Sequence, residues 1–152
     1  MPGIGTAAPE PTDPRRDAYL SELIERIDRN MIISGMGERP AVVHLADFRL
    51  PSFTSGSVCI APRLSMGLLE ALLRGDRATA ERLHAAFMSL EDCRDAHNPV
   101  RVLHEAVSLA GIADMGPVLP LMSNLEPAHR DKVREVARML LALNDRPLSE
   151  SA

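Results

Sequence analysis

The sequence is poor in aromatic residues, cysteine and lysine. Its 152 residues include no tryptophan, one tyrosine and three phenylalanines, and Lys132 is the only lysine. Two cysteines, Cys59 and Cys93, are too few for a disulfide framework and do not form a Cys-x-x-Cys metal pair. We therefore expect both to be small apolar residues in a reducing cytoplasm.

The chain also lacks a basic excess and a long apolar run. Its formal net charge is −4, whereas nucleic-acid binding requires a clustered basic surface. No apolar run approaches the roughly 20 residues that span a bilayer, and residues 1–13 lack a signal-peptide pattern. These absences predict a cytoplasmic chain without a nucleic-acid or membrane partner, and its length suits a single core.

The first part of the chain alternates between helical and strand-like patterns. Residues 1–12 are predicted to be a flexible lead-in, and Asp13 followed by Pro14 is a typical helix start. The short runs 31–34 and 53–60 are apolar or β-branched, as buried strands are. Residues 13–62 thus predict a parallel sheet covered by helices.

From residue 63 to residue 144 the pattern is helical only, followed by a polar tail over residues 145–152. Asp76 and the pair Asn98-Pro99 predict helix starts, while Gly75 and Gly111 predict helix ends. Two parallel strands alone would leave both sheet edges unpaired. Either the helices cover these strands, or another polypeptide supplies further strands.

Two small-residue motifs could bind a ligand. Gly35-Met36-Gly37 follows a predicted strand, where backbone N–H groups can bind an anion. A dinucleotide fingerprint would need a third glycine where Pro40 stands, so a tight strand-to-helix turn is the simpler interpretation. Thr54-Ser55-Gly56-Ser57 could hold a carboxylate or a carbonyl. Alternatively, these residues are small because helices pack closely on them, and both interpretations stay open.

The histidines do not predict a metal centre or a catalytic triad. His44 and Asp47 are three residues apart, but no third ligand is evident. His97 precedes the Asn98-Pro99 helix start and is expected to serve local packing. We expect no metal and no cofactor.

The order of motifs resembles the second half of the dihydrodipicolinate synthase and N-acetylneuraminate lyase family. The similar segments follow one another between about residues 20 and 143: Ile33-Ser34-Gly35, Ser52 to Pro62, Arg74-Gly75-Asp76, Asn98-Pro99 and Leu119-Pro120-Leu121. The resemblance implies an α/β fold, namely the C-terminal fragment of a (β/α)8 TIM barrel with an added helical region. Residues 31–34 and 53–59 would then be the seventh and eighth barrel strands.

The resemblance also implies an activity. Members of this family are lyases or aldolases that form a Schiff base between a lysine and a 2-oxo acid, typically pyruvate. By this resemblance Gly35, Thr54 and Ser55 are the substrate-binding candidates. The Schiff-base lysine is missing, because residues 1–12 contain none and Lys132 lies on the last predicted helix.

These expectations lead to two hypotheses about function. The chain is a partial Schiff-base lyase, inactive alone, that forms a homo-oligomer or pairs with a complementing barrel half. Alternatively, it is a non-catalytic helical interaction module. A barrel cut before its seventh strand would expose an unpaired edge along residues 31–34, so we expect self-association.

Overall fold

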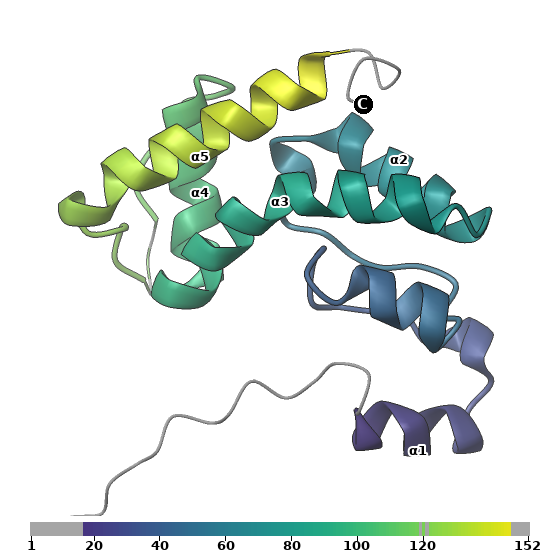
Figure 1. The fold of residues 1–152 in the computed structure, drawn as a ribbon. Coiled ribbons are helices and arrows are strands. Elements are labelled where there is room, and N and C mark those ends of the chain that lie inside the picture. Colours follow the sequence, from purple (N-terminus) through teal and green to yellow (C-terminus); the bar gives the residue numbers. More distant parts are fainter. Residues whose placement is uncertain (1–16, 119, 121, 147–152) are drawn as a thin grey trace, which may run out of the picture.

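The computed structural model describes residues 17–118, 120 and 122–146, and this part of the chain is helical (Figure 1). Between the first two α-helices the chain forms only single helical turns, a 3₁₀ turn η2, a π-helical turn η3 and a 3₁₀ turn η4. In chain order the elements are α1 (Ala18–Arg26), η2 (Arg29–Met31), η3 (Val43–Asp47), η4 (Ser57–Cys59), α2 (Pro62–Leu73), α3 (Arg77–His97), α4 (Pro99–Ala110) and α5 (Pro127–Asp145).

Helices α2 to α5 form a helical body around one apolar core. Leu64, Leu68 and Leu72, spaced four residues apart, are buried along one face of α2 in the same core cluster as Phe87 and Leu90 of α3. Helices α4 and α5 contribute the buried residues Val102, Ala106, Val133, Val136 and Leu140 to the same core.

The boundaries of these helices follow from local signals. The Asp76 carboxylate accepts a hydrogen bond from the Thr79 N–H, and the Asn98 side chain accepts from the first N–H groups of α4. Gly111 ends α4 with a left-handed conformation, φ +83°, which a residue without Cβ adopts at little cost. The helices predicted between residues 63 and 144 are confirmed.

A contact between distant residues closes the helical body. Asn144, near the end of α5, accepts hydrogen bonds from the backbone N–H groups of Arg63 (2.9 Å) and Leu64 (3.4 Å). Since Ala61 provides no side-chain cap for α2, Asn144 satisfies N–H groups that the helix itself leaves unpaired. The C-terminal end of α5 is thereby tied to the N-terminal end of α2.

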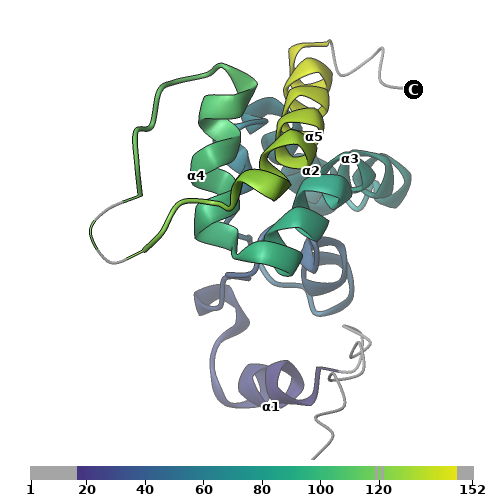
Figure 2. The ribbon, with the colours of Figure 1, turned by 90° about the vertical axis from the view of Figure 1, so that its left-hand side faces the viewer.

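Helix α1 lies apart from this body in both views (Figures 1 and 2). Asp17 caps its start, whereas the predicted start at Asp13-Pro14 lies outside the described residues. Leu20, Ile24 and Ile27 are apolar residues at helical spacing, but only Leu20 is buried; Ile24 is partly buried, and Ile27 is 44% exposed.

The expected α/β fold, with the last two strands of a TIM barrel, is wrong. The described residues contain no β-strand, and residues 31–34 and 53–60 form one isolated parallel bridge between Ser34 and Phe53. In this bridge the Ser34 N–H donates to the Ser52 carbonyl (3.1 Å), and the Thr54 N–H donates to the Ser34 carbonyl (2.7 Å). Beyond it both segments turn away, the first into the approach to η3 and the second into η4.

The physical reason is that a parallel strand is stabilised by its neighbours. β-propensity measures the fit of a side chain to a packed sheet rather than an intrinsic backbone preference, and no described strand flanks either segment. Gly35, Gly37 and Gly56 further allow both segments to bend. The described chain is therefore all-α.

Candidate functional site

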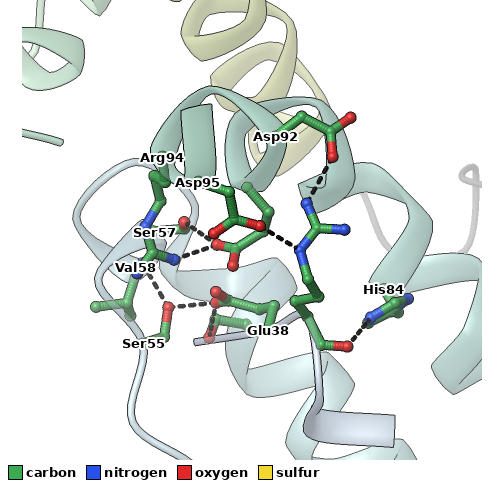
Figure 3. Close-up of polar contacts among 11 residues, drawn as sticks. Glu38, Ser55, Ser57, Val58, His84, Asp92, Arg94 and Asp95 are labelled. Carbon is green, nitrogen blue, oxygen red and sulfur yellow. Dashed lines mark hydrogen bonds and ion pairs between the residues drawn. The ribbon is translucent and has the colours of Figure 1, made fainter. Parts of the chain in front are cut away.

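The most unusual site in the described structure is a group of buried polar side chains that joins the segment before α2 to the helical body (Figure 3). We call it the carboxyl cluster. It contains two carboxyl groups, one guanidinium and three hydroxyls, from Glu38, Glu91, Arg94, Ser55, Ser57 and Ser65.

Glu38 is the most buried member of the carboxyl cluster, with an exposed fraction of 0%. Its Oε1 atom accepts hydrogen bonds from the hydroxyls of Ser55 and Ser65, the latter at 3.1 Å. Its Oε2 atom is also buried and has no hydrogen-bond partner. Because a buried ionised carboxylate is costly unless it is fully paired, this arrangement favours the protonated form of Glu38.

The environment raises the pKa of Glu38 above its ordinary value. Burial is the main cause, and the negative charge of Glu91 acts in the same direction, while the hydrogen bonds from Ser55 and Ser65 partly oppose it. The nearby guanidinium of Arg94 forms an ion pair with Glu91. The described cluster thus places one guanidinium beside two buried carboxyl groups, which is consistent with the raised pKa of Glu38.

Glu91 lies on α3 and is 2% exposed. Its Oε1 atom accepts hydrogen bonds from the Ser57 hydroxyl (3.0 Å) and from Nη1 of Arg94. Charge-assisted bonds of this kind are among the stronger hydrogen bonds in proteins. They fix the loop that contains Ser57 against α3.

Gly37 lets the backbone approach this ion pair. A Cβ atom at Gly37 would lie 2.6 Å from Nη1 of Arg94 and 3.0 Å from Oε2 of Glu91, and the residue has φ +80°. The positive φ favours glycine, and a Cβ here would also displace the ends of the paired Arg94 and Glu91 side chains. Of the two interpretations of Gly35-Met36-Gly37, the geometry of Gly37 fits the turn, because it packs against side chains of α3.

A more exposed set of ion pairs lies beside the carboxyl cluster. The guanidinium of Arg39 is 2.5 Å from an oxygen of Asp92 and 2.8 Å from an oxygen of Asp95. The carbonyl of Arg39 is 2.9 Å from Nε2 of His84 on α3 (Figure 3). These contacts attach the segment before η3 to α3 on the outer side.

The carboxyl cluster offers one chemical property, a buried carboxyl group, Glu38, whose pKa is raised. A general acid needs a raised pKa and a substrate within hydrogen-bond reach. Glu38 has the first property, but its complete burial keeps substrate atoms away in this conformation. The cluster therefore acts as a polar connection between two parts of the fold.

The three predicted substrate-binding residues lie around the Ser34–Phe53 bridge, and their side chains face different surroundings. Gly35 and Thr54 are exposed and flank the Ser34–Phe53 bridge. The hydroxyl of Ser55 instead points inward, donates to Glu38 and accepts from the Val58 N–H at 3.0 Å.

The predictions for His44 and Lys132 can also be compared with the structure. His44 Nδ1 is 2.8 Å from the Ser34 hydroxyl, and burial lowers the pKa of this histidine, whereas Asp47 pairs with Arg77 at 3.1 Å. Within the described residues, no three side chains are grouped as metal ligands would be. Lys132 lies on α5 with 62% of its side chain exposed, 3.0 Å from Glu135.

Sequence reasoning missed Glu38 and Glu91. A signal for Glu91 exists, because it follows the buried Leu90 and lies four residues after the buried Phe87, on the core side of α3. Glu38 gives no such signal, since its burial depends on residues 17 and 27 positions later in the chain, Ser55 and Ser65.

Comparisons with family models, curated proteins and solved structures found no match to this chain. No helix among the described residues is long and apolar enough to cross a membrane.

Proposed function

We propose that this chain is a helical interaction module that binds another polypeptide through residues 19–36, which precede η3. The single observation that carries this proposal is a concentration of exposed apolar side chains over residues 19–36. Five of the twelve large hydrophobic residues that are exposed in the described structure fall in this stretch: Tyr19, Ile27, Met31, Ile33 and Met36. We call Met31, Ile33 and Met36 the apolar edge; their exposed fractions are 77%, 55% and 70%.

The backbone of the apolar edge supports one kind of partner. The N–H and C=O of Ser34 both bond toward the 52–54 segment. In an extended segment the groups of the adjacent residues point to the opposite side, and Ile33 and Gly35 form no backbone hydrogen bond with another described residue. A partner that adds one strand beside residues 33–35 would satisfy these groups and cover the apolar edge.

The helical body supports the role of a stable platform. Most of its buried apolar residues come from α2 to α5, residues 41–61 add to the same core, and the Asn144 contact closes it. The carboxyl cluster then holds the 34–60 segment on α3. The proposed partner thus binds beside residues 33–35, which pair with residues 52–54 on one side and have no described pairing on the other.

Self-association tests this proposal, because a second copy of the chain offers the same open edge. Changing Met31, Ile33 and Met36 to serine should abolish association in sedimentation velocity over a concentration series. The matched control changes Met66, Leu73 and Met139, which are 52%, 63% and 55% exposed on α2 and α5, and should leave association unchanged. A wild-type chain that stays monomeric at high concentration, with slow amide exchange at Ile33 and Gly35, would contradict the proposal.

A second candidate function is that of one part of a Schiff-base lyase or aldolase acting on 2-oxo acids such as pyruvate. It rests on the order of motifs given above; the single Ser34–Phe53 bridge does not form the two barrel strands that the resemblance implied. The chain would be inactive alone, because Lys132, its only lysine, is exposed on α5, whereas a Schiff-base lysine needs a desolvated pocket.

Complementation distinguishes the two functions. A separately expressed N-terminal half from a lyase of that family should restore pyruvate-dependent activity if the second candidate holds. If the chain is only an interaction module, this addition changes nothing. In both cases we propose a cytoplasmic location and a protein rather than a nucleic-acid partner.

A further inference from the structure

A cleft at the junction of α3, α4 and α5 contains an arginine with no acidic partner among the described residues. Its volume is about 210 Å³, and its lining includes His97, Arg101 and His129, together with Ala96, Leu125 and Glu126. The first turns of α4 and α5 and the last turn of α3 meet here, because α4 and α5 run side by side in the same direction (Figure 2).

Arg101 is half-buried, and its Nε atom is fully shielded from solvent without a hydrogen-bond partner. Its guanidinium forms no ion pair or hydrogen bond with any described residue. Burying part of a charged group is unfavourable unless the charge is compensated. Arg101 therefore has a buried Nε donor with no acceptor among the described residues.

Two imidazole rings lie in the same cleft. His97 and His129 are stacked with their centroids 3.7 Å apart and an interplanar angle of 19°. One ring comes from the end of α3 and the other from the first turn of α5. Each ring carries at least one N–H donor in either protonation state, so donors from three helices converge at this site.

The N-terminal end of α5 also makes the cleft favourable for an anion. No side chain caps the N-terminus of this 19-residue helix, and the first turn of a helix carries a partial positive charge. By contrast, the N-terminus of α4 is occupied by the Asn98 side chain. The guanidinium and the two imidazoles remain the main evidence, and the helix end supplements them.

We propose that this cleft binds a small oxyanion of the phosphate class, either free phosphate or the phosphoryl group of a small molecule. A planar guanidinium donates two parallel hydrogen bonds to such an anion, and the imidazoles would contact its other oxygens. The volume is below the usual 300–1,000 Å³ of a site for a drug-sized ligand, which suits a compact ion. This site is independent of the apolar edge.

Glu126 is the one negative group in the cleft, and it sharpens the test. Its side chain is 77% exposed, and its Oε2 atom is 3.8 Å from Nε2 of His129, beyond hydrogen-bond distance. Removing this charge should therefore strengthen anion binding, whereas removing the charge of Arg101 should weaken it. Opposite effects from two neighbouring residues are not expected of a general change in stability.

The experiment titrates the full ¹⁵N-labelled chain with inorganic phosphate at constant ionic strength, using chloride as the balancing anion. We expect saturable shifts for residues 97–101 and 126–130. Arg101→Gln should lower the affinity about tenfold or more, as the loss of a charge-assisted hydrogen bond does, and Glu126→Gln should raise it about two- to fivefold. Glycerol phosphate, titrated in parallel, separates a preference for the free ion from one for an esterified group.

Arg26→Gln is the matched control, because it removes one positive charge on α1, where Arg26 pairs with Glu22. This variant should bind phosphate like the wild type. Shifts that do not saturate, or an equal loss of affinity in Arg26→Gln and Arg101→Gln, would mean an adventitious ion only and would overturn the proposal. Circular dichroism establishes that each variant is folded, and Arg101→Lys replaces Arg101→Gln if that variant is not.

Discussion

At the scale of single residues, the carboxyl cluster depends on the charge of Glu38. The pKa of Glu38 is raised above its ordinary value of 4.5, mainly by burial, so the folded chain holds this proton more tightly than the unfolded chain does. The stabilisation that this proton provides is present below pH 4.5 and is lost as the pH rises through the folded pKa. Above that pH, the charged Glu38 faces Glu91 in a buried site.

The free energy of unfolding of Glu38→Gln should therefore fall less than that of the wild type as the pH rises. Glutamine keeps the shape of the protonated acid but cannot ionise, so the variant should be more stable than the wild type at pH 8 and lose this advantage toward pH 4.5. Urea denaturation at both pH values measures the difference. Because burial lowers the pKa of His44, acid destabilises both proteins, and the difference between them removes this contribution.

Glu70→Gln is the control for this comparison. Glu70 lies on α2 with 61% of its side chain exposed, 3.7 Å from Arg74, and exposed pairs of this kind contribute little to stability. Its stability difference from the wild type should not vary with pH in the same way. If Glu38→Gln and Glu70→Gln behave alike, Glu38 is ionised in the folded chain at neutral pH.

At the scale of elements, sequence reasoning succeeded where the signals were local. The helices α2 to α5 follow from apolar residues at helical spacing and from caps such as Asp76, Asn98 and Gly111. The two strand predictions failed because a strand needs neighbours, and only Ser34 and Phe53 pair. The carboxyl cluster could not be predicted either, since contacts over long sequence separations define it.

The turn between the bridge and η3 gives a prediction with an internal control. Gly37→Ala should destabilise the chain by about 1–3 kcal/mol, because alanine is strained at positive φ and its Cβ would collide with Arg94. Gly35→Ala should have little effect, since a Cβ there meets no atom within 4 Å. Thermal denaturation compares the two variants.

The location of the damage is part of this prediction. Gly37→Ala should speed amide exchange at Ser34 and Thr54, whose backbone groups pair across the bridge, while α4 and α5 keep their protection. Equal stability of the two alanine variants would show that the close approach of Gly37 to the Glu91–Arg94 pair is not required.

At the scale of the whole molecule, the chain has two parts of different expected stability. The helical body supplies most of the core and residues 41–61 supply a further part, whereas α1 has nine residues and buries only Leu20. Isolated helices shorter than about 12–15 residues are marginal in water unless packing supports them. The long elements should therefore open only with global unfolding, and α1 should open on its own.

Native-state hydrogen exchange should reveal this order directly. We expect amides of α3 and α5 to exchange most slowly, those of residues 38–60 at an intermediate rate set by the carboxyl cluster, and those of α1 and residues 29–36 fastest. Raising the protein concentration should slow exchange at Ile33 and Gly35 alone, because a second copy that pairs along the apolar edge would use these free backbone groups. If the amides of α1 exchange as slowly as those of α3, then residues 19–36 are an integral part of the core rather than an open docking surface.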